Sequence, residues 1–313
     1  MLFWAIVLKT MMDGIYFMTK KKFFVCLLML LVPSFLVPYD FPVDTRQPLT
    51  FFGQHLFPNS ETQNVPVCET GMVFSNAEIV RVSENAVNLI AIEKSNHLLS
   101  FPSVLGNAIV SQTDNGFQVI YGNLEETSLL YDKANIFRFE TLGKTDINSD
   151  GTRQVLIFKI FDTTEKNKNF VNPVLFLPEL ADKRAPEIRA LLLLSEEGQL
   201  IPISQRMTVK SGTYTLCVEA FDTIDNLDVR LSPFEIIALL NGNTIASLTF
   251  QTMAAKKGVT KMGDSVELAN LYSRFPYISL GTVHLTEGTS RLSISVRDYN
   301  RNRAEQNIEI NVN

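Results

Sequence analysis

The chain has 313 residues, of which 46% are hydrophobic and 19% charged, and its formal net charge is -5. This composition is typical of a globular protein with hydrophobic cores and excludes a disordered chain, while the length suits about two domains. No stretch rich in Lys and Arg follows the first two dozen residues, so the basic surface that nucleic-acid binding needs is missing and no nucleic-acid partner is expected.

Residues 1–37 form a predicted targeting segment. Three consecutive lysines precede a long apolar run, which is the pattern of a secretory signal. The run is short for a membrane span of about 20 residues and contains Pro33, so a cleaved signal peptide is favoured over an uncleaved N-terminal membrane anchor. Both alternatives predict an exported protein of the periplasm or cell envelope. The true start is either Met1 or Met18.

An extended arm and a first β domain are predicted next. Residues 38–67 are rich in Pro, Phe and polar residues without a sustained period, and we expect this arm to pack partly on the first β domain. Residues 68–180 carry short β-rich runs separated by turn residues, which predicts an antiparallel sheet. The clearest hairpin joins the runs 107–112 and 117–121 through Asn-Gly, because both residues tolerate positive φ. The run 155–161 is predicted to add a strand to the same sheet.

A second β domain is predicted after a short linker at residues 181–185. Residues 186–313 contain strand-like runs with the spacing of an antiparallel sandwich, similar to an immunoglobulin-like module. In the run that begins at Gly212, apolar and polar residues alternate as in a half-buried strand. One short helix is expected near residues 264–273. The predicted fold class is therefore all-β throughout.

Cysteine and histidine are scarce. After the targeting segment only Cys68 and Cys217 remain, and Cys217 is expected to be a small buried hydrophobe in a strand rather than half of a disulfide. The three histidines are His55, His97 and His284, which we interpret as turn, surface or strand residues. A zinc site built from alternative histidines is therefore not expected.

Five pieces of sequence follow one another in a recognisable order. They are the segment Gly71-Met72-Val73-Phe74, the strand pair EIVRVSENAVNLIAIEK, the stretch LGNAIVSQTDNGFQVIYGNL, the glycine-containing loop and strand over residues 143–158, and the exit VNPVLFLP. As an ordered set they resemble the β-sheet core of the lysostaphin/LytM-type zinc metalloendopeptidases, which cut peptide cross-links in peptidoglycan. The resemblance implies a LytM-type antiparallel β domain, the duplicated hybrid motif fold, over residues 68–180.

The resemblance also locates the catalytic groups of that family, and this sequence replaces each of them. Glu69 and Val73 stand where the family has a zinc-binding His and Asp, and Asn123 stands where it has the His of Tyr-x-His-Leu. Val155 and Ile157 stand where it has its His-x-His pair. A hydrolytic zinc site needs three protein ligands and an open position, and Val and Ile cannot bind metal. The departures imply a degenerate member without metal, cofactor or catalytic residues.

Two acidic stretches could suggest cation sites. Residues 146–151 fit the first half of a calcium loop, but its twelfth position is Ile157 instead of Glu and no helices flank it. A polar turn is the preferred interpretation. Asp222, Asp225 and Asp228 follow a predicted strand, and a strand-end loop is likewise preferred to a cation site.

Three functions stay open at this point. The preferred one is a catalytically inactive endopeptidase-like protein of the cell envelope that binds cell-wall peptide or regulates a wall hydrolase. The second is an active zinc endopeptidase whose metal site is aligned wrongly, and the third is a structural scaffold of the envelope. Zinc content separates the second from the others, and binding to peptidoglycan separates the first from the third.

Overall fold

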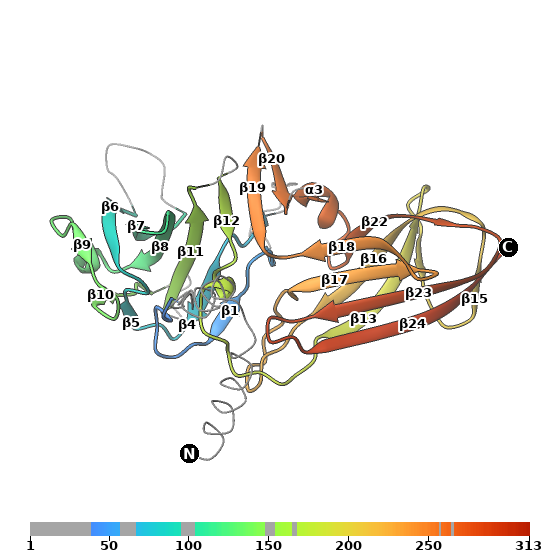
Figure 1. Cartoon of the computed structure of the whole chain (residues 1–313), viewed down its shortest axis with the longest axis horizontal. Helices are drawn as coiled ribbons and strands as arrows, with labels where there is room; N and C mark the ends of the chain where they lie inside the picture. Colours follow the sequence, from blue (N-terminus) through green and yellow to red (C-terminus); the bar gives the residue numbers. More distant parts are fainter. Residues whose placement is uncertain are drawn as a thin grey trace, which may run out of the picture. The chain divides into compact units, whose positions relative to one another are not determined.

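The computed structural model describes residues 39–56, 67–94, 104–147, 154–164, 168–256, 258–263 and 266–313. Within these ranges the protein is all-β, as predicted, and its helical elements are short: η1 (Glu126–Ser128), η2 (Pro173–Leu175) and α3 (Leu268–Leu271) (Figure 1). No helix in the described ranges has the length and apolar character that crossing a membrane requires. The predicted targeting segment lies outside the described residues, which form one compact unit from Tyr39 to Asn313.

The largest sheet has 11 strands. Their order is β21-β20-β19-β12-β11-β8-β7-β6-β9, and β4 joins β11 beside β12 and carries β1 on its other edge. The strands are β1 (Pro48–Thr50), β4 (Met72–Ser75), β6 (Ala86–Ile92), β7 (Asn107–Thr113), β8 (Phe117–Leu124), β9 (Asn135–Ile136), β11 (Val155–Asp162), β12 (Asn169–Val171), β19 (Thr252–Lys256), β20 (Val259–Met262) and β21 (Val266–Glu267). There are two further two-stranded sheets, β5 (Ile79–Arg81) with β10 (Thr141–Lys144) and β2 (His55–Leu56) with β3 (Val67–Cys68).

The predicted hairpin is present as β7 and β8, but its turn differs from the expected form. Gly116 has a φ of +88°, its N–H donates to the carbonyl of Thr113 at 3.2 Å, and Asn115 is not among the residues with positive φ. The connection is therefore a three-residue loop that ends in one left-handed glycine, instead of a two-residue turn with positive φ at both positions. The Asn-Gly pair located the hairpin correctly because glycine still supplies the left-handed residue.

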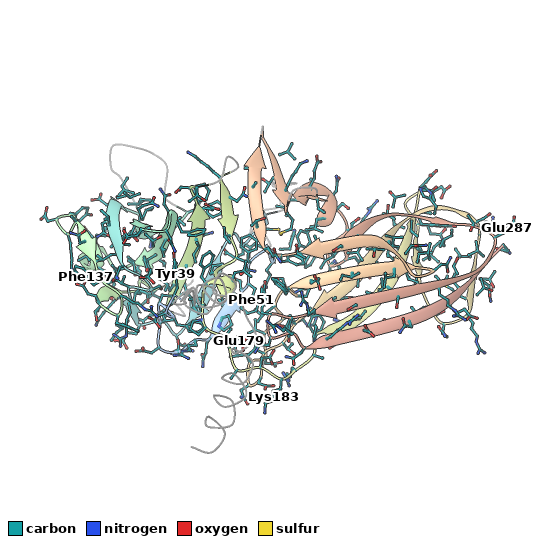
Figure 2. All side chains as sticks on the ribbon, in the orientation of Figure 1. Tyr39, Phe51, Phe137, Glu179, Lys183 and Glu287 are labelled. Carbon is teal, nitrogen blue, oxygen red and sulfur yellow. The ribbon has the colours of Figure 1, made fainter. Side chains whose placement is uncertain are left out.

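One face of the large sheet packs on a hydrophobic core to which the N-terminal arm contributes. Leu156, Phe158 and Ile160 alternate along β11 and are fully buried in this core. Tyr39 and Phe51 of the arm are buried against the same core and are labelled in Figure 2. The arm also pairs with the sheet through β1, so residues 39–51 pack on the first β domain as expected, while Phe52 is buried in the other core.

The C-terminal part contains two further sheets whose facing side chains form a second core. The four-stranded sheet has the order β14-β13-β16-β22, with β13 (Glu187–Ser195), β14 (Leu200–Pro202), β16 (Gly212–Phe221) and β22 (Ile278–Leu285). The five-stranded sheet has the order β15-β24-β23-β17-β18, with β15 (Met207–Val209), β17 (Glu235–Leu240), β18 (Asn243–Thr249), β23 (Gly288–Arg297) and β24 (Arg303–Val312). Both sheets contribute to one buried cluster, so they form a sandwich. All pairings are antiparallel except β15 with β24.

The sandwich supplies strands to the large sheet, which was not predicted. Phe170 and Val171 of β12 pair with Met253 and Thr252 of β19, so the hairpin β19–β20 extends the first sheet. The sequence predicted an irregular stretch over 251–280 with one short helix, and only the helix, α3, is confirmed. The hairpin was missed because its strands are short and its loop is rich in Lys and Gly.

The two cores also exchange residues. Phe52 belongs to the arm and Cys68 is the first residue of the predicted first β domain, yet both are buried in the sandwich core. Ile224 and Leu231 of the sandwich are buried in the core of the large sheet. The division into domains at 68–180 and 186–313 stays a prediction. Cys68 and Cys217 are free and buried, and burial raises the pKa of Cys217 to about 11.

Candidate functional site

Three neighbouring strands bring together four of the five positions that the sequence resemblance singled out, which we call the degenerate positions. β11 pairs with β4 on one edge, where Ile157 lies opposite Val73, and with β8 on the other, where Ile157 lies opposite Gly122. Residues directly opposite each other in an antiparallel pair project from the same face of the sheet. Val155 lies two residues along β11 and therefore shares this face. Val73, Val155 and Ile157 thus form one apolar patch, which we call the valine-isoleucine patch.

The valine-isoleucine patch has no metal-binding capacity. Its three side chains are hydrocarbon, with Val155 buried and Val73 and Ile157 half-buried. The space beside it is also filled by the chain itself. A Cβ added to Gly122 would meet the carbonyl oxygen of Leu105 at 2.8 Å, so the backbone of Leu105 lies over the centre of these strands. Glycine is required at 122 because of this close approach.

Asn123 has a structural role beside the patch. It has a φ of 61° and stands at an irregularity of the β7–β8 ladder, where Asn107 pairs with Leu124 and Ala108 with Gly122. Its side-chain N–H₂ group donates to the carbonyls of Asp146 and Val155, both at 2.9 Å. Both amide protons are therefore committed to backbone carbonyls, and the side chain ties β8 to β11 and to the segment before residue 148.

Glu69, the fifth position, forms an ion pair with Lys159, which follows Ile157 by two residues in β11. Lys159 of β11 places its Nζ 2.8 Å from the Glu69 carboxylate and 2.7 Å from the Thr70 hydroxyl. The same carboxylate oxygen accepts the N–H of Gly71 at 3.0 Å. The side chains of Glu69 and Lys159 are only 6% and 15% exposed, so this is a buried ion pair. Lys159 shares the face of the valine-isoleucine patch because it is two residues from Ile157.

Zinc does not fit these five positions. A zinc site needs three or four N, S or O donors around one point. Three positions offer hydrocarbon and the Glu69 carboxylate already holds an ammonium group, so the amide oxygen of Asn123 is one oxygen donor where three ligands are needed. Among the described residues, the one group of three or more His, Cys, Asp or Glu whose ligand atoms lie within 4.8 Å of one another is Asp182, Asp222 and Asp298, and it contains none of the five.

The histidines do not rebuild a site in the described ranges. The His55 ring stacks on Phe275, with centroids 4.6 Å apart, and lies 5.1 Å from Tyr272. Burial lowers the pKa of His55, so its neutral form is favoured. His284 in β22 has its Nδ1 3.0 Å from the hydroxyl of Thr213. His97 lies outside the described residues.

The calcium-like loop is described only in part. Asp146 places its carboxylate 3.3 Å from Lys94 Nζ and accepts the N–H of Ile147 with its other oxygen. The carboxylate is thus engaged by a lysine and by a turn, which agrees with the polar-turn interpretation of this one residue. The rest of the motif, residues 148–151, lies outside the described ranges, so the preference for a turn over a calcium site stays a prediction.

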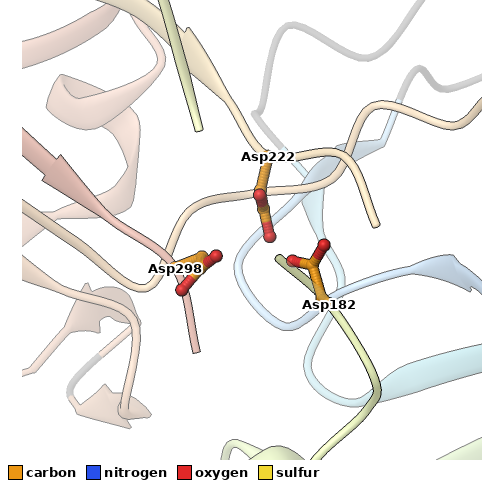
Figure 3. A group of neighbouring side chains, drawn as sticks. All are labelled: Asp182, Asp222 and Asp298. Atoms are coloured by element: carbon orange, nitrogen blue, oxygen red, sulfur yellow. The ribbon is translucent and has the colours of Figure 1, made fainter. Parts of the chain in front are cut away.

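An acidic cluster that the sequence did not indicate lies at the junction of three segments. Asp222 follows β16, Asp182 belongs to the predicted linker and Asp298 follows β23, and their carboxylates point toward a common centre (Figure 3). Asp222 and Asp298 are each 1% exposed. Of the acidic residues grouped with Asp222 in the sequence, Asp225 binds the N–H of Lys183 instead. Asp228 is exposed, and neither belongs to the cluster.

The cluster relieves its repulsion most simply by holding a proton. Burial, followed by the negative charges of Asp298 and Asp182, raises the pKa of Asp222 to about 7. Burial also raises the pKa of Asp298. The Asp298 oxygens accept the backbone and side-chain N–H groups of Asn302, both at 2.7 Å, and one Asp182 oxygen accepts the N–H of Arg184 at 3.0 Å. We therefore interpret the three as a proton-sharing group in which Asp222 is protonated at mildly acidic pH.

The sequence marks Asp222 as an acidic residue at the end of a strand, but no local signal points to its two partners in the cluster. Asp182 lies in a charged linker and Asp298 in a turn between two strands, and aspartate is common in both settings. Only the tertiary fold brings them to Asp222. Lys159 was missed for a similar reason, because an isolated lysine in an apolar strand does not reveal its partner.

Comparison with known proteins does not identify the chain. A family model matches residues 185–313, less than half of the chain, and carries no functional description. No curated protein matches. Among solved structures, a chain of the SpoIIQ–SpoIIIAH pore-forming complex is 18% identical, with 45% of this chain and 90% of that chain covered and a TM-score of 0.33. The solution structure of lysostaphin is 13% identical, with 83% and 86% covered and a TM-score of 0.32. Likenesses this distant establish neither a family nor an activity for this chain.

Proposed function

We propose that this protein is a catalytically inactive, lysostaphin/LytM-like protein of the cell envelope that binds cell-wall peptide. The observation that carries the proposal is the state of the five positions at which the motif order would place zinc and its catalytic partners. The valine-isoleucine patch supplies hydrocarbon, Asn123 ties strands together, and Glu69 is neutralised by Lys159. A hydrolase built here would lack both the Lewis acid and the base that peptide hydrolysis needs.

Lys159 provides a physical account of why the altered site is stable. A buried carboxylate is costly unless a positive charge compensates it. In the active relatives that the sequence resembles, the residue at position 69 faces a metal cation. In this chain the ammonium of Lys159, 2.8 Å from Glu69, supplies the compensating charge from within the protein. The fold can therefore keep an acidic residue at this place without any metal.

A cleft beside Lys159 is the proposed peptide site. Phe161 lies two residues along β11 on the same face and lines a cleft of about 340 Å³ together with Phe170 and Met253. Lys168, which is exposed, also lines this cleft. An apolar cleft with a cation suits an extended peptide that carries apolar side chains and a carboxylate. The cleft therefore adds a place for peptide binding to a face that cannot hydrolyse one.

We place the protein outside the cytoplasm, and the support is the lysine-plus-apolar pattern of residues 1–37. Cell fractionation tests this part separately. Soluble cytosolic protein that retains residues 1–37 would contradict it.

The function is tested on purified protein by three measurements made together. Metal analysis of protein prepared without chelator is expected to find no stoichiometric zinc, and incubation with peptidoglycan is expected to release no peptides. Co-sedimentation with insoluble peptidoglycan is expected to retain the protein. Phe161→Ala should weaken this retention about tenfold if the aromatic wall is a binding contact, while the matched control Phe137→Ala, 60% exposed elsewhere, should leave it unchanged.

Each alternative has its own outcome. About one zinc per chain, or peptide release that a chelator abolishes, would support the active endopeptidase. If the protein contains no zinc and also fails to bind peptidoglycan, the structural scaffold is the alternative that is supported. Capture of a wall hydrolase with a change in its rate, without binding to peptidoglycan, would support regulation of the hydrolase in place of wall binding.

A further inference from the structure

A larger cleft lies where the N-terminal arm meets the sandwich. It has a volume of about 800 Å³, and none of the five degenerate positions lines it, although the backbone N–H of Glu69 donates to the carbonyl of Gln54 in its wall. Its walls come from the arm (residues 54–56), from the ends of β13 and β16, from the loop 230–233 and from the approach to β22. Volumes of about 300–1,000 Å³ are typical of sites for small ligands. Nothing in the proposed function uses this cleft.

Several polar groups of the cleft are already committed to the protein. The hydroxyl of Tyr272 donates to the carbonyl of Gly53 at 2.5 Å, and the hydroxyl of Ser232 donates to the carbonyl of Phe52 at 2.8 Å. The side chain of Gln54 accepts the N–H of Phe51 with its oxygen and donates from its nitrogen to a backbone carbonyl. These groups hold the walls in place and have limited capacity for a ligand.

Of the two arginines that line the cleft, one has no ion-pair partner among the described residues. Arg189 and Glu219 face each other across β13 and β16, with 3.4 Å between Nη1 and Oε1. Arg230 stacks its guanidinium on the ring of Phe221, 4.5 Å from the centroid, and has no carboxylate partner among the described residues. Stacking on a ring fixes the plane of the guanidinium and leaves its N–H groups available at the edge. The cleft therefore presents an oriented arginine that has no ion pair among the described residues, although it also borders a neighbouring cleft lined by Glu187 and Asp228.

Apart from His55, whose ring stacks on Phe275, the remaining lining is apolar. Leu56, Phe275, Pro276 and Ile278 line the cleft, and the exposed fraction of Phe275 is 42%. We infer that this cleft binds the C-terminal carboxylate of a short peptide with apolar side chains, with Arg230 as the carboxylate-binding residue. The guanidinium fork matches a carboxylate in a two-point contact, and the apolar wall accepts the side chains that precede it.

A carboxylate is favoured over a phosphate on charge. Two arginines and one glutamate line the cleft, so its net charge is that of a single cation. A monoanion compensates this charge, whereas a dianionic phosphate would leave an excess negative charge near Glu219. The inference does not depend on the proposed function, because the two clefts share no lining residue.

Calorimetric titration of the full chain tests the inference with two matched probes. The first is acetyl-Leu-Ala-Ala with a free C-terminal carboxylate, and the second is the same peptide as its C-terminal amide. We expect the acid to bind and the amide to bind about tenfold to a hundredfold more weakly, because a charged hydrogen-bonded contact is lost. Arg230→Met keeps an unbranched apolar stem but removes the charge. It should weaken the affinity for the acid by the same factor and leave the affinity for the amide unchanged.

Two controls keep the outcome clear. Arg291→Met removes an arginine whose side chain is 82% exposed on the other sheet of the sandwich, and it should change neither affinity. Phe275→Ala should weaken both probes alike, because it removes apolar wall without touching the charge. Equal affinity for acid and amide in the unaltered protein, no binding of either at millimolar concentration, or preferential binding of phenyl phosphate would each overturn the inference.

Discussion

The acidic cluster makes the stability of this protein depend on pH in a predictable direction. The pKa of Asp222 is raised from 3.8 to about 7 by burial and by its two acidic neighbours. In the unfolded chain this carboxyl ionises near 3.8, while in the folded chain it keeps its proton to about 7. The contribution of the Asp222 proton to the unfolding free energy is thus fully present below pH 3.8 and is lost as the pH rises through about 7.

The size of the effect follows from the two pKa values. At about 1.4 kcal/mol for each pH unit, the interval between 3.8 and about 7 corresponds to up to about 4 kcal/mol of unfolding free energy. Asp222→Asn removes the titration and preserves the shape of the side chain. Its oxygen can still accept the N–H of Thr223, and its new amide protons can donate to the carboxylates of Asp182 and Asp298. The variant should therefore be more stable than the native protein at pH 8 and more nearly equal to it at pH 4.

Urea unfolding at several pH values between 4 and 8.5, with a chelator present, measures this difference. The quantity compared is the unfolding free energy of Asp222→Asn minus that of the native protein. Asp228→Asn, a change at an exposed residue in the same loop, serves as the control and should show no such dependence. The reasoning is refuted if the two variants give the same pH profile. A native profile that becomes flat when calcium replaces the chelator would assign the cluster to a metal ion instead.

Three further predictions concern the large sheet. Replacing both Val155 and Ile157 by His should lower the melting temperature without creating stoichiometric zinc binding, as metal analysis would show, because two imidazoles enter an apolar patch that has no further metal ligand. Lys159→Met should cost about 3–5 kcal/mol in urea unfolding, since it leaves the Glu69 carboxylate buried without a positive charge, and adding Glu69→Gln should recover much of that loss; equal stability of the single and double variants would contradict a compensating ion pair. Gly116→Ala should destabilise by about 1 kcal/mol or more in urea unfolding, because the residue has a φ of +88° and an added Cβ would clash with Thr164 Cγ2; unchanged stability would contradict this.

Local pattern was sufficient to predict most of the strands. β8 and β11 are long, rich in β-branched and aromatic residues, and bounded by turn residues, so their existence follows from short-range propensity. The burial of Tyr214, Leu216 and Val218 in β16 follows from the period of two, whereas Cys217 is buried on the opposite face, which alternation does not predict. The motif order placed Val73 and Ile157 close together, and the strand register brings them opposite each other.

What the sequence could not supply is non-local pairing. Met253 joins Phe170 across more than eighty residues of chain, and no periodicity within either strand selects that partner. The contact between Lys159 and Glu69 depends on which strand lies beside β11, and the meeting of Asp222 with Asp298 depends on how two loops close. Such pairings are decided by the global fold, and sequence reasoning that works within a window of ten residues does not reach them.

The pairing of β12 with β19 has a consequence for the order in which the chain can be completed. Strand β12 acquires its outer neighbour only after the chain has been synthesised to about residue 256, although the other strands of its sheet up to β11 precede residue 163. Until then, β12 is an edge whose backbone N–H and carbonyl groups lack partners, and such edges are where foreign strands attach. A fragment that ends near residue 185 would keep this edge open and would lack Ile224 and Leu231 from its core. Expression of that fragment alone is therefore expected to give aggregation, and its solubility should return when residues 186–313 are supplied on a second chain.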